Sequence, residues 1–237
     1  MLWREQPMPG VSLEKSDRHI YCELEQPREV FSSAILNGGF SQARGFVNLK
    51  VANQSEPGAI CHALPSETLA KYCQQQDWPV DCVGMMTAAS MNSLRFQVVE
   101  ADTVQLLLLV TTGLGNARRA GDSVAADLAQ QSASAEAVQV GTINTAVISN
   151  RRFSAAALAE MMTMATEAKC AALQDAGVVS PVSGQIATGT GTDSVAIFNG
   201  LPDAGADILY CGKHTLLGQV FAQSLMALIT DSISWQD

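Results

Sequence analysis

The 237-residue sequence has few basic, histidine and aromatic residues. Fourteen Lys and Arg stand against 23 Asp and Glu, which gives a formal net charge of -9, and the basic residues form no run. Non-specific nucleic-acid binding depends on clustered Lys and Arg, so we expect no nucleic-acid partner. The sequence also has only three histidines and no Cys-x-x-Cys pair, so it predicts no metal site of the histidine or cysteine type.

Long apolar runs are also missing. The best run, Val104 to Val110, is far shorter than the roughly 20 residues that span a bilayer. The N-terminal stretch MLWREQPMPG has no long apolar segment after its Arg, as a secretion signal would have. We therefore expect a cytoplasmic chain with no membrane partner, in which six scattered cysteines stay reduced and mostly buried: Cys22, Cys61, Cys73, Cys82, Cys170 and Cys211.

What the sequence does contain is enough apolar residues for a large core. The hydrophobic fraction is 47% and the charged fraction 16%, and no repeat or linker divides the chain, so residues 1–237 are predicted to form one domain. Three helices are expected: one capped by Ser66, one from Ser154 to Gly177, and one beginning near His214. Short β-rich runs predict strands at 30–36, 46–51, 83–90, 94–100, 104–112, 145–149 and 194–198.

This mixture predicts an α/β or α+β layered sandwich with a mixed β-sheet and flanking helices. The middle helix carries one anomalous charge. At 100° per residue, Lys169 falls about 20° from Leu158, within a Met/Leu stripe that faces the core. A buried ammonium needs a partner, and we expect that partner to be Asp122 or Asp193.

Two glycine-rich stretches suggest a ligand site. In VTTGLGNARRAGD, Val110 to Asp122, the spacing fits neither a Walker loop nor a dinucleotide fingerprint. It is typical of a strand end whose backbone approaches a ligand, or of a simple turn with solvated arginines. The second stretch, ATGTGTDSVAIF, alternates Gly and Thr before Asp193, and it suits either an oxyanion site or a hairpin end.

Three smaller motifs can be interpreted either as parts of a functional site or as ordinary structural features. In CGKHTLLG, His214 at a helix start would favour the neutral imidazole of a base, with Lys213 beside it. LNGG and GTINTAVISN place Asn37 and Asn144 next to strands, where they fit turns as readily as ligand contacts.

As a set, these motifs resemble the adenosylcobinamide amidohydrolase (CbiZ) family. The resemblance covers roughly Val30 to Gly218, through LNGGFSQARGFVNLKV, VGMMTAASM, TTGLGNARRAGD, GTINTAVISN, TEAKCAALQDAGV, ATGTGTDSVAI and YCGKHTLLG, in that order. It implies hydrolysis of the amide that joins aminopropanol to the corrin ring, which yields adenosylcobyric acid in corrinoid (cobalamin) salvage. The corrinoid would be substrate, and no cofactor is implied. A homo-oligomer is compatible with the sequence.

Site roles follow from the chemistry of amide hydrolysis, with alternatives open at each step. We predict His214 or Asp193 as general base, Lys169 or Lys213 as oxyanion stabiliser, and Thr190 or Thr192 as nucleophile. The residues predicted to bind the corrinoid are Asn37, Gly113, Asn116, Arg118, Arg119, Asp122, Asn144, Gly189 and Gly191. Two other readings remain: a corrinoid-binding protein without catalysis, and an amidohydrolase that cleaves its own chain before a Thr or Ser.

Overall fold

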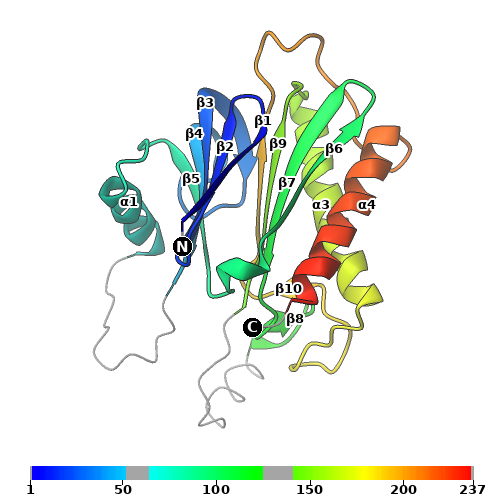
Figure 1. The fold of residues 1–237 in the computed structure, drawn as a ribbon. Helices are drawn as coiled ribbons and strands as arrows, with labels where there is room; N and C mark the ends of the chain where they lie inside the picture. The colour runs from blue at the N-terminus through cyan, green and yellow to red at the C-terminus, as the bar shows by residue number, and fades with distance from the viewer. Residues whose placement is uncertain (1, 52–63, 125–140, 236–237) are drawn as a thin grey trace.

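The computed structural model of the chain describes residues 2–51, 64–124 and 141–235 (Figure 1). Its strands are β1 (Trp3–Met8), β2 (Val11–Lys15), β3 (His19–Ser32), β4 (Gly39–Lys50), β5 (Cys82–Thr87), β6 (Arg95–Ala101), β7 (Val104–Thr112), β8 (Ala117–Arg118), β9 (Ile143–Ser149), β10 (Gly189–Thr190) and β11 (Ser194–Phe198). Its α-helices are α1 (Pro65–Gln75), α3 (Ala155–Asp175) and α4 (Leu216–Ile233).

Nine strands form one mixed sheet that folds back on itself. The order is β1-β2-β3-β11-β9-β7-β6, and β4 pairs with β3 on one side and with β5 on the other. The pairs β4/β5 and β9/β11 are parallel, whereas the other pairs in this sheet are antiparallel. The long strand β3 pairs with β2 through its first half and with β11 through its last residues. The outer strands meet where the rings of Trp3 and Phe96 lie 5.6 Å apart, so the sheet is nearly closed.

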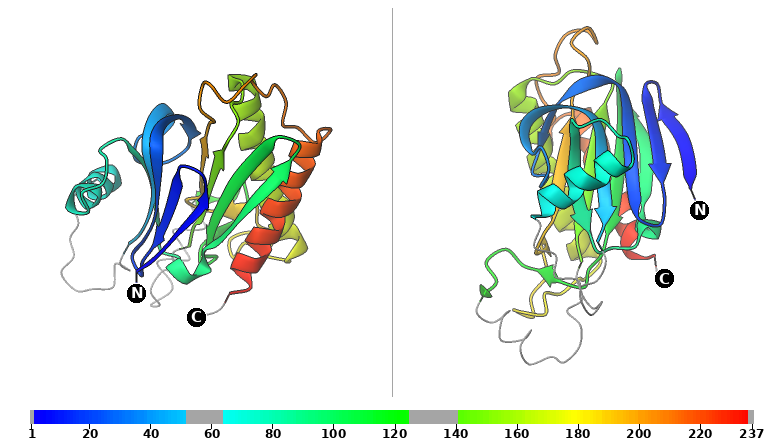
Figure 2. Two further views of the ribbon diagram at one scale, coloured as in Figure 1. Left: turned by 45° about the horizontal axis from the view of Figure 1, so that its top comes forward. Right: turned by 90° about the vertical axis from the view of Figure 1, so that its left-hand side faces the viewer.

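The folded sheet and the helices make four layers, as Figures 1 and 2 show. An apolar core between the two halves of the sheet contains Leu13 and Phe46 from one half and Leu107 and Phe198 from the other. A second core joins α3 and α4 to the outer face of β6, β7, β9 and β11. A smaller one joins α1 to β3, β4 and β5. The coarse prediction of a mixed, layered α/β protein is confirmed.

The helix ends show which sequence signals were read correctly. The Ser154 hydroxyl accepts a hydrogen bond from the Ala157 N–H, and Gly177 has φ +63°, as the predicted cap and stop require. The Ser66 cap is wrong, because α1 already begins at Pro65 and the Glu67 carboxylate accepts the Leu64 N–H instead. The last helix is capped by Thr215, one residue after His214.

Helix α4 is long and apolar enough to cross a membrane by those two criteria alone. In the described fold it packs against α3, β6 and β7 and buries Phe221, Leu225 and Ile229 in the helix-side core. A helix that is buried on one face in this way needs no bilayer to explain its composition. The expectation of no membrane partner remains a prediction.

The carboxyl group of Glu14 on β2 makes folding stability depend on acid pH. Burial alone would raise its pKa, but hydrogen bonds from His19 and Arg4 outweigh burial and hold the pKa below its usual value. A carboxyl with a depressed folded-state pKa stabilises the fold above its unfolded pKa of about 4.3, and this stabilisation is lost as pH falls through the folded value. We therefore expect the unfolding free energy of Glu14→Gln to fall less than that of the wild type as the pH decreases below about 4.5.

The measurement is urea unfolding of wild type and variant at pH 7, 4.5 and 3, with Glu5→Gln on the exposed edge of β1 as the matched control. The wild type should lose more unfolding free energy than Glu14→Gln between pH 4.5 and 3, whereas Glu5→Gln should follow the wild type. Identical pH profiles for all three proteins would contradict the assignment.

Candidate active site

The two glycine-rich stretches lie side by side. Strands β8 and β10 form a two-stranded antiparallel sheet in which Arg118 pairs with Gly189 and Ala117 with Thr190 (Figure 1). The Thr188 N–H also donates to the Arg118 carbonyl at 2.9 Å. Segments some 70 residues apart in sequence therefore meet at the end of the sheet where β7 ends and β9 and β11 begin.

Lys169 on α3 reaches this edge and binds Asp193. Its Nζ lies 2.6 Å from Asp193 Oδ2, and the two side chains are only 15% and 11% exposed. Of the two predicted partners, Asp193 is correct. Asp122 instead accepts hydrogen bonds from Ser180 and from the Arg119 N–H, and the bond from Ser180, together with one from Ser183, holds its pKa below the usual value.

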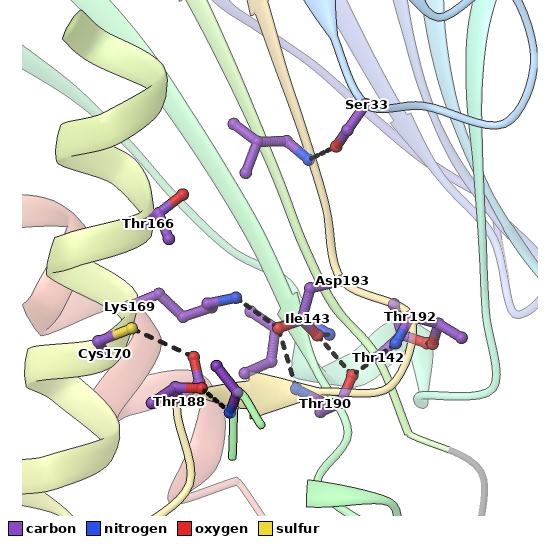
Figure 3. A network of polar contacts seen from close by, with 12 residues as sticks. Ser33, Thr142, Ile143, Thr166, Lys169, Cys170, Thr188, Thr190, Thr192 and Asp193 are labelled. Carbon is purple, nitrogen blue, oxygen red and sulfur yellow. Dashed lines mark hydrogen bonds and ion pairs between the residues drawn. The ribbon is translucent and has the colours of Figure 1, made fainter. Parts of the chain in front are cut away.

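Four donors converge on the Asp193 carboxylate, as Figure 3 shows. Oδ2 accepts from Lys169 Nζ and from the Thr190 N–H at 3.0 Å. Oδ1 accepts from the Ile143 N–H at 2.9 Å and from the Thr190 hydroxyl at 2.5 Å. A carboxylate has about four lone-pair sites, so these contacts hold Asp193 in one orientation. The carboxylate thus ties α3, β9 and β10 together at the start of β11.

Gly189 is required by the same ion pair. A Cβ placed on Gly189 would lie 2.2 Å from Asp193 Oδ2 and 2.8 Å from Lys169 Nζ, both too close for a real contact. The backbone of β10 must approach the pair this closely because the Thr190 N–H donates to Asp193. The glycine is therefore explained by packing against the ion pair.

A second polar group lies next to the first. The hydroxyls of Thr142 and Thr192 are 2.7 Å apart, and both contact the Gly141 carbonyl, at 2.8 and 3.3 Å. The side chain of Asn116 accepts the Gly141 N–H at 3.0 Å. The predicted residues Asn116, Gly189, Thr190, Thr192 and Asp193 are thus brought together with Lys169 at one edge, and Gly113 hydrogen-bonds Thr142 through its backbone.

The predicted His-Lys pair faces elsewhere. Lys213 is 65% exposed and pairs with Glu167, which lies two residues before Lys169 and therefore on the opposite side of α3. His214 is exposed and directly precedes the cap of α4. The structure does not bring Lys213 or His214 together with the Lys169–Asp193 pair.

Three of the predicted binding residues serve the local backbone. Asn37, with φ +53°, donates to the Cys82 carbonyl at 2.7 Å. Arg119 donates to the Ile186 carbonyl at 3.0 Å, and Arg118 to the Ala117 carbonyl at 2.9 Å. Gly191 remains exposed beside Asn116. Their contacts with a substrate remain predictions.

Sequence reasoning missed a buried amide pair. Asn48 on β4 accepts from Asn144 on β9 at 2.8 Å and donates to Thr111 on β7 at 2.8 Å, so it joins the two halves of the sheet. The signal was the lone amide in the apolar run FVNLKV, which predicts a polar position on a half-buried strand. Asn144, predicted to bind substrate, lies on the inter-sheet face, whereas Asp193 faces α3.

The arrangement has the parts of a nucleophilic hydrolase. The Thr190 hydroxyl donates to the Asp193 carboxylate, and the Lys169 ammonium fixes that carboxylate; a nucleophile, a base and a group that orients the base form the general pattern of an activated nucleophile. Within residues 2–51, 64–124 and 141–235, no group of three His, Cys, Asp or Glu side chains is placed to hold a metal ion. Two surface cavities of about 510 and 460 Å³ lie away from Lys169 and Asp193.

The fold is a mixed, layered α/β architecture, and the polar cluster at its edge joins a hydroxyl, a carboxylate and an ammonium. A family model for adenosylcobinamide amidohydrolase (CbiZ) matches residues 5–237, so the chain belongs to that family. An uncharacterized protein of Methanocaldococcus jannaschii is 28% identical over 167 residues, which span 66% of this chain and 64% of that relative.

Two solved structures have similar folds at low identity. The L-aminopeptidase D-Ala-esterase/amidase of Ochrobactrum anthropi, described as a variant of the Ntn hydrolase fold, is 11% identical with a TM-score of 0.43, over 98% of this chain and 82% of that one. A β-aminopeptidase of a Burkholderia species is 13% identical with a TM-score of 0.44, over 98% and 87%.

Replacing Gly189 tests the packing of the ion pair. We expect Gly189→Ala to lower the unfolding free energy by about 2–4 kcal/mol, because the added methyl displaces one of two poorly exposed charges from its partner. Gly191→Ala is the matched control: its Cβ meets only Asn116 Nδ2, at 3.4 Å, and the cost should stay within about 1 kcal/mol. Urea unfolding measures both, and equal effects of the two changes would contradict the geometry.

Proposed function

We propose that this chain hydrolyses the amide between aminopropanol and the corrin-ring propionate of adenosylcobinamide, and that Thr190, Asp193 and Lys169 carry the reaction. Family membership supports the substrate class. One observation supports the site: the Thr190 hydroxyl lies 2.5 Å from Asp193 Oδ1, while Lys169 holds Oδ2 at 2.6 Å. This geometry joins a nucleophile, a base and a residue that orients the base.

The first half of the reaction forms an acyl-enzyme. Thr190 Oγ attacks the amide carbon as its proton moves to Asp193, and the carbonyl oxygen becomes an oxyanion. Collapse of this intermediate breaks the C–N bond, and the proton passes from Asp193 to the departing amine of aminopropanol. In the second half a water molecule gives a proton to Asp193 while its oxygen attacks the ester carbon. The bond to Thr190 Oγ then breaks, Asp193 returns the proton to Thr190 Oγ, and adenosylcobyric acid is released.

Lys169 has two roles in this scheme. Its ammonium fixes the carboxylate that receives the proton, and its positive charge favours the negative charge of the intermediate. The adjacent hydroxyls of Thr142 and Thr192 and the amide of Asn116 supply donors and acceptors for an amide-rimmed ligand. Cytoplasmic localisation fits this salvage role and is part of the proposal.

Thr190 provides the sharpest test of the catalytic assignment. We expect Thr190→Val to lower kcat about a thousandfold or more and Thr190→Ser to retain activity, because only the serine keeps a hydroxyl. Release of aminopropanol and adenosylcobyric acid from adenosylcobinamide, followed by mass spectrometry, measures the rates. The control is Thr163→Val on the exposed face of α3, whose hydroxyl bonds only its own helix at the Ala159 carbonyl.

Full activity of Thr190→Val, with thermal unfolding unchanged, would exclude Thr190 as nucleophile. No turnover by the wild type, combined with normal corrinoid binding, would instead favour a binding protein.

Lys169 is tested against another lysine. Lys169→Met should reduce kcat by about a hundredfold or more, since it removes both the charge and the orientation of Asp193. Lys71→Met, an exposed lysine on α1, should leave kcat unchanged. Equal rates for the two variants would contradict a catalytic role for Lys169.

The alternative of self-processing can be tested at Thr142. The Thr142 hydroxyl lies 2.8 Å from the carbonyl oxygen of Gly141, the residue before it, at the start of β9. Cleavage there would give two fragments, whereas the proposed Thr190 mechanism needs an intact chain. We expect the intact mass of the purified protein to be 25.1 kDa, and a pair of fragments meeting at Gly141–Thr142 would favour an N-terminal threonine nucleophile instead.

A further inference from the structure

A cavity of about 460 Å³ opens at the start of α3, far along the helix from Lys169. Apolar side chains of the β3–β4 hairpin and α3 line it, together with Glu29, Arg152, Asn199 and Asp207. Its volume is in the range of small-molecule sites, and its lining combines apolar surface with a few convergent polar groups. The site described above does not use any of these residues.

Two stacked aromatic rings, those of Phe31 and Phe40, form an aromatic platform next to this cavity. Phe40 is 69% exposed, and its ring stacks on Phe31 with centroids 4.3 Å apart and planes at 18°. Phe31 in turn packs against the helix-side core, so the platform is supported from below. An exposed, supported aromatic face is suited to stacking with a flat heterocycle, a contact that is typical of nucleobase recognition.

The charged groups of the cavity are two carboxylates and one guanidinium. Glu29 and Asp207 are each partly exposed, and both contact the guanidinium of Arg152, at 3.3 and 3.9 Å. Two carboxylates on one guanidinium leave a net negative charge, which does not suit an anion but suits hydroxyl and amino donors. Carboxylates that accept from ribose hydroxyls are a known device in nucleotide-binding proteins.

The cavity and Lys169 share one stripe of α3, the stripe that faces the sheet. Leu158, which lines the cavity, and Lys169 are eleven residues apart on α3, hence about 20° apart around the helix and about 16 Å apart along it. Strand β11 begins next to Asp193, packs against α3 and pairs with the end of β3. Phe31 pairs with Ile197, and the Ser33 hydroxyl, labelled in Figure 3, accepts from the N–H of Val195, which lies two residues after Asp193 in the chain.

We propose that this cavity binds the adenosyl group of the corrinoid, with adenine stacked on Phe40 and the ribose hydroxyls directed at Glu29 and Asp207. The inference rests on the proposed function, because it takes adenosylcobinamide as the substrate. The scissile amide then reaches Thr190 while the adenosyl group occupies the start of α3. The site therefore selects the adenosylated form of the corrinoid over forms with a small axial ligand.

The test compares KM for adenosylcobinamide and cyanocobinamide, which carries cyanide in place of the nucleoside. We expect the wild type to have the lower KM for the adenosylated form. Phe40→Ala should raise that KM about tenfold, within the range that loss of base stacking gives, and should leave kcat and the KM for cyanocobinamide within twofold. Tyr210→Ala, equally exposed at 68% and outside the cavity, should change neither KM.

A Phe40→Ala variant that changes both KM values equally, or neither, would overturn the adenosyl site while leaving the proposed reaction intact. If the wild type turns over neither corrinoid, the proposed function fails instead. Calorimetric titration of both corrinoids into wild type and Phe40→Ala then tests adenosyl binding in the cavity without turnover. Tighter binding of the adenosylated form by the wild type, lost in the variant, supports the site. Equal affinities of the wild type for the two corrinoids contradict it.

Discussion

The ion pair between Lys169 and Asp193 is the constraint on which the candidate site depends. Two opposite charges that are nearly removed from water must be paired and hydrogen-bonded, because an isolated buried charge costs several kcal/mol. The Asp193 carboxylate meets that requirement with four donors from three elements. The same requirement explains why β10 approaches α3 so closely and why Gly189 has no side chain.

Part of this site could be predicted from the sequence because helical periodicity is local. Lys169 stood out as a charge within an apolar stripe, and the carboxylates near the glycine-rich stretches reduced its partners to two. The cap at Ser154 and the stop at Gly177 are likewise local signals, and both are confirmed. The choice of Asp193 over Asp122 needed the fold, because it depends on which loop lies beside α3.

The rest of the site and of the sheet could not be predicted, because it depends on pairing between distant segments, which local sequence patterns do not contain. Strands β8 and β10 have two residues each, too short for a periodic signal, yet they bring the two glycine-rich stretches together. Strands β1 and β2 and the first half of β3 were missed because their exposed faces carry many polar residues. His214 and Lys213 were judged from the helix they precede, and only the fold shows that Lys213 pairs with Glu167 on the opposite side of α3.

The central claim is that the ion pair orients Asp193 to receive the proton of Thr190, which then becomes covalently acylated. Mass spectrometry of the chain, acid-quenched during turnover of adenosylcobinamide, tests this most directly. We predict a fraction of the chain that is heavier by the corrinoid acyl group, with the added mass on the peptide that contains Thr190. Two results would contradict the account. One is a chain that stays unmodified throughout turnover in both the wild type and the Thr190→Ser variant, and the other is an adduct on another residue.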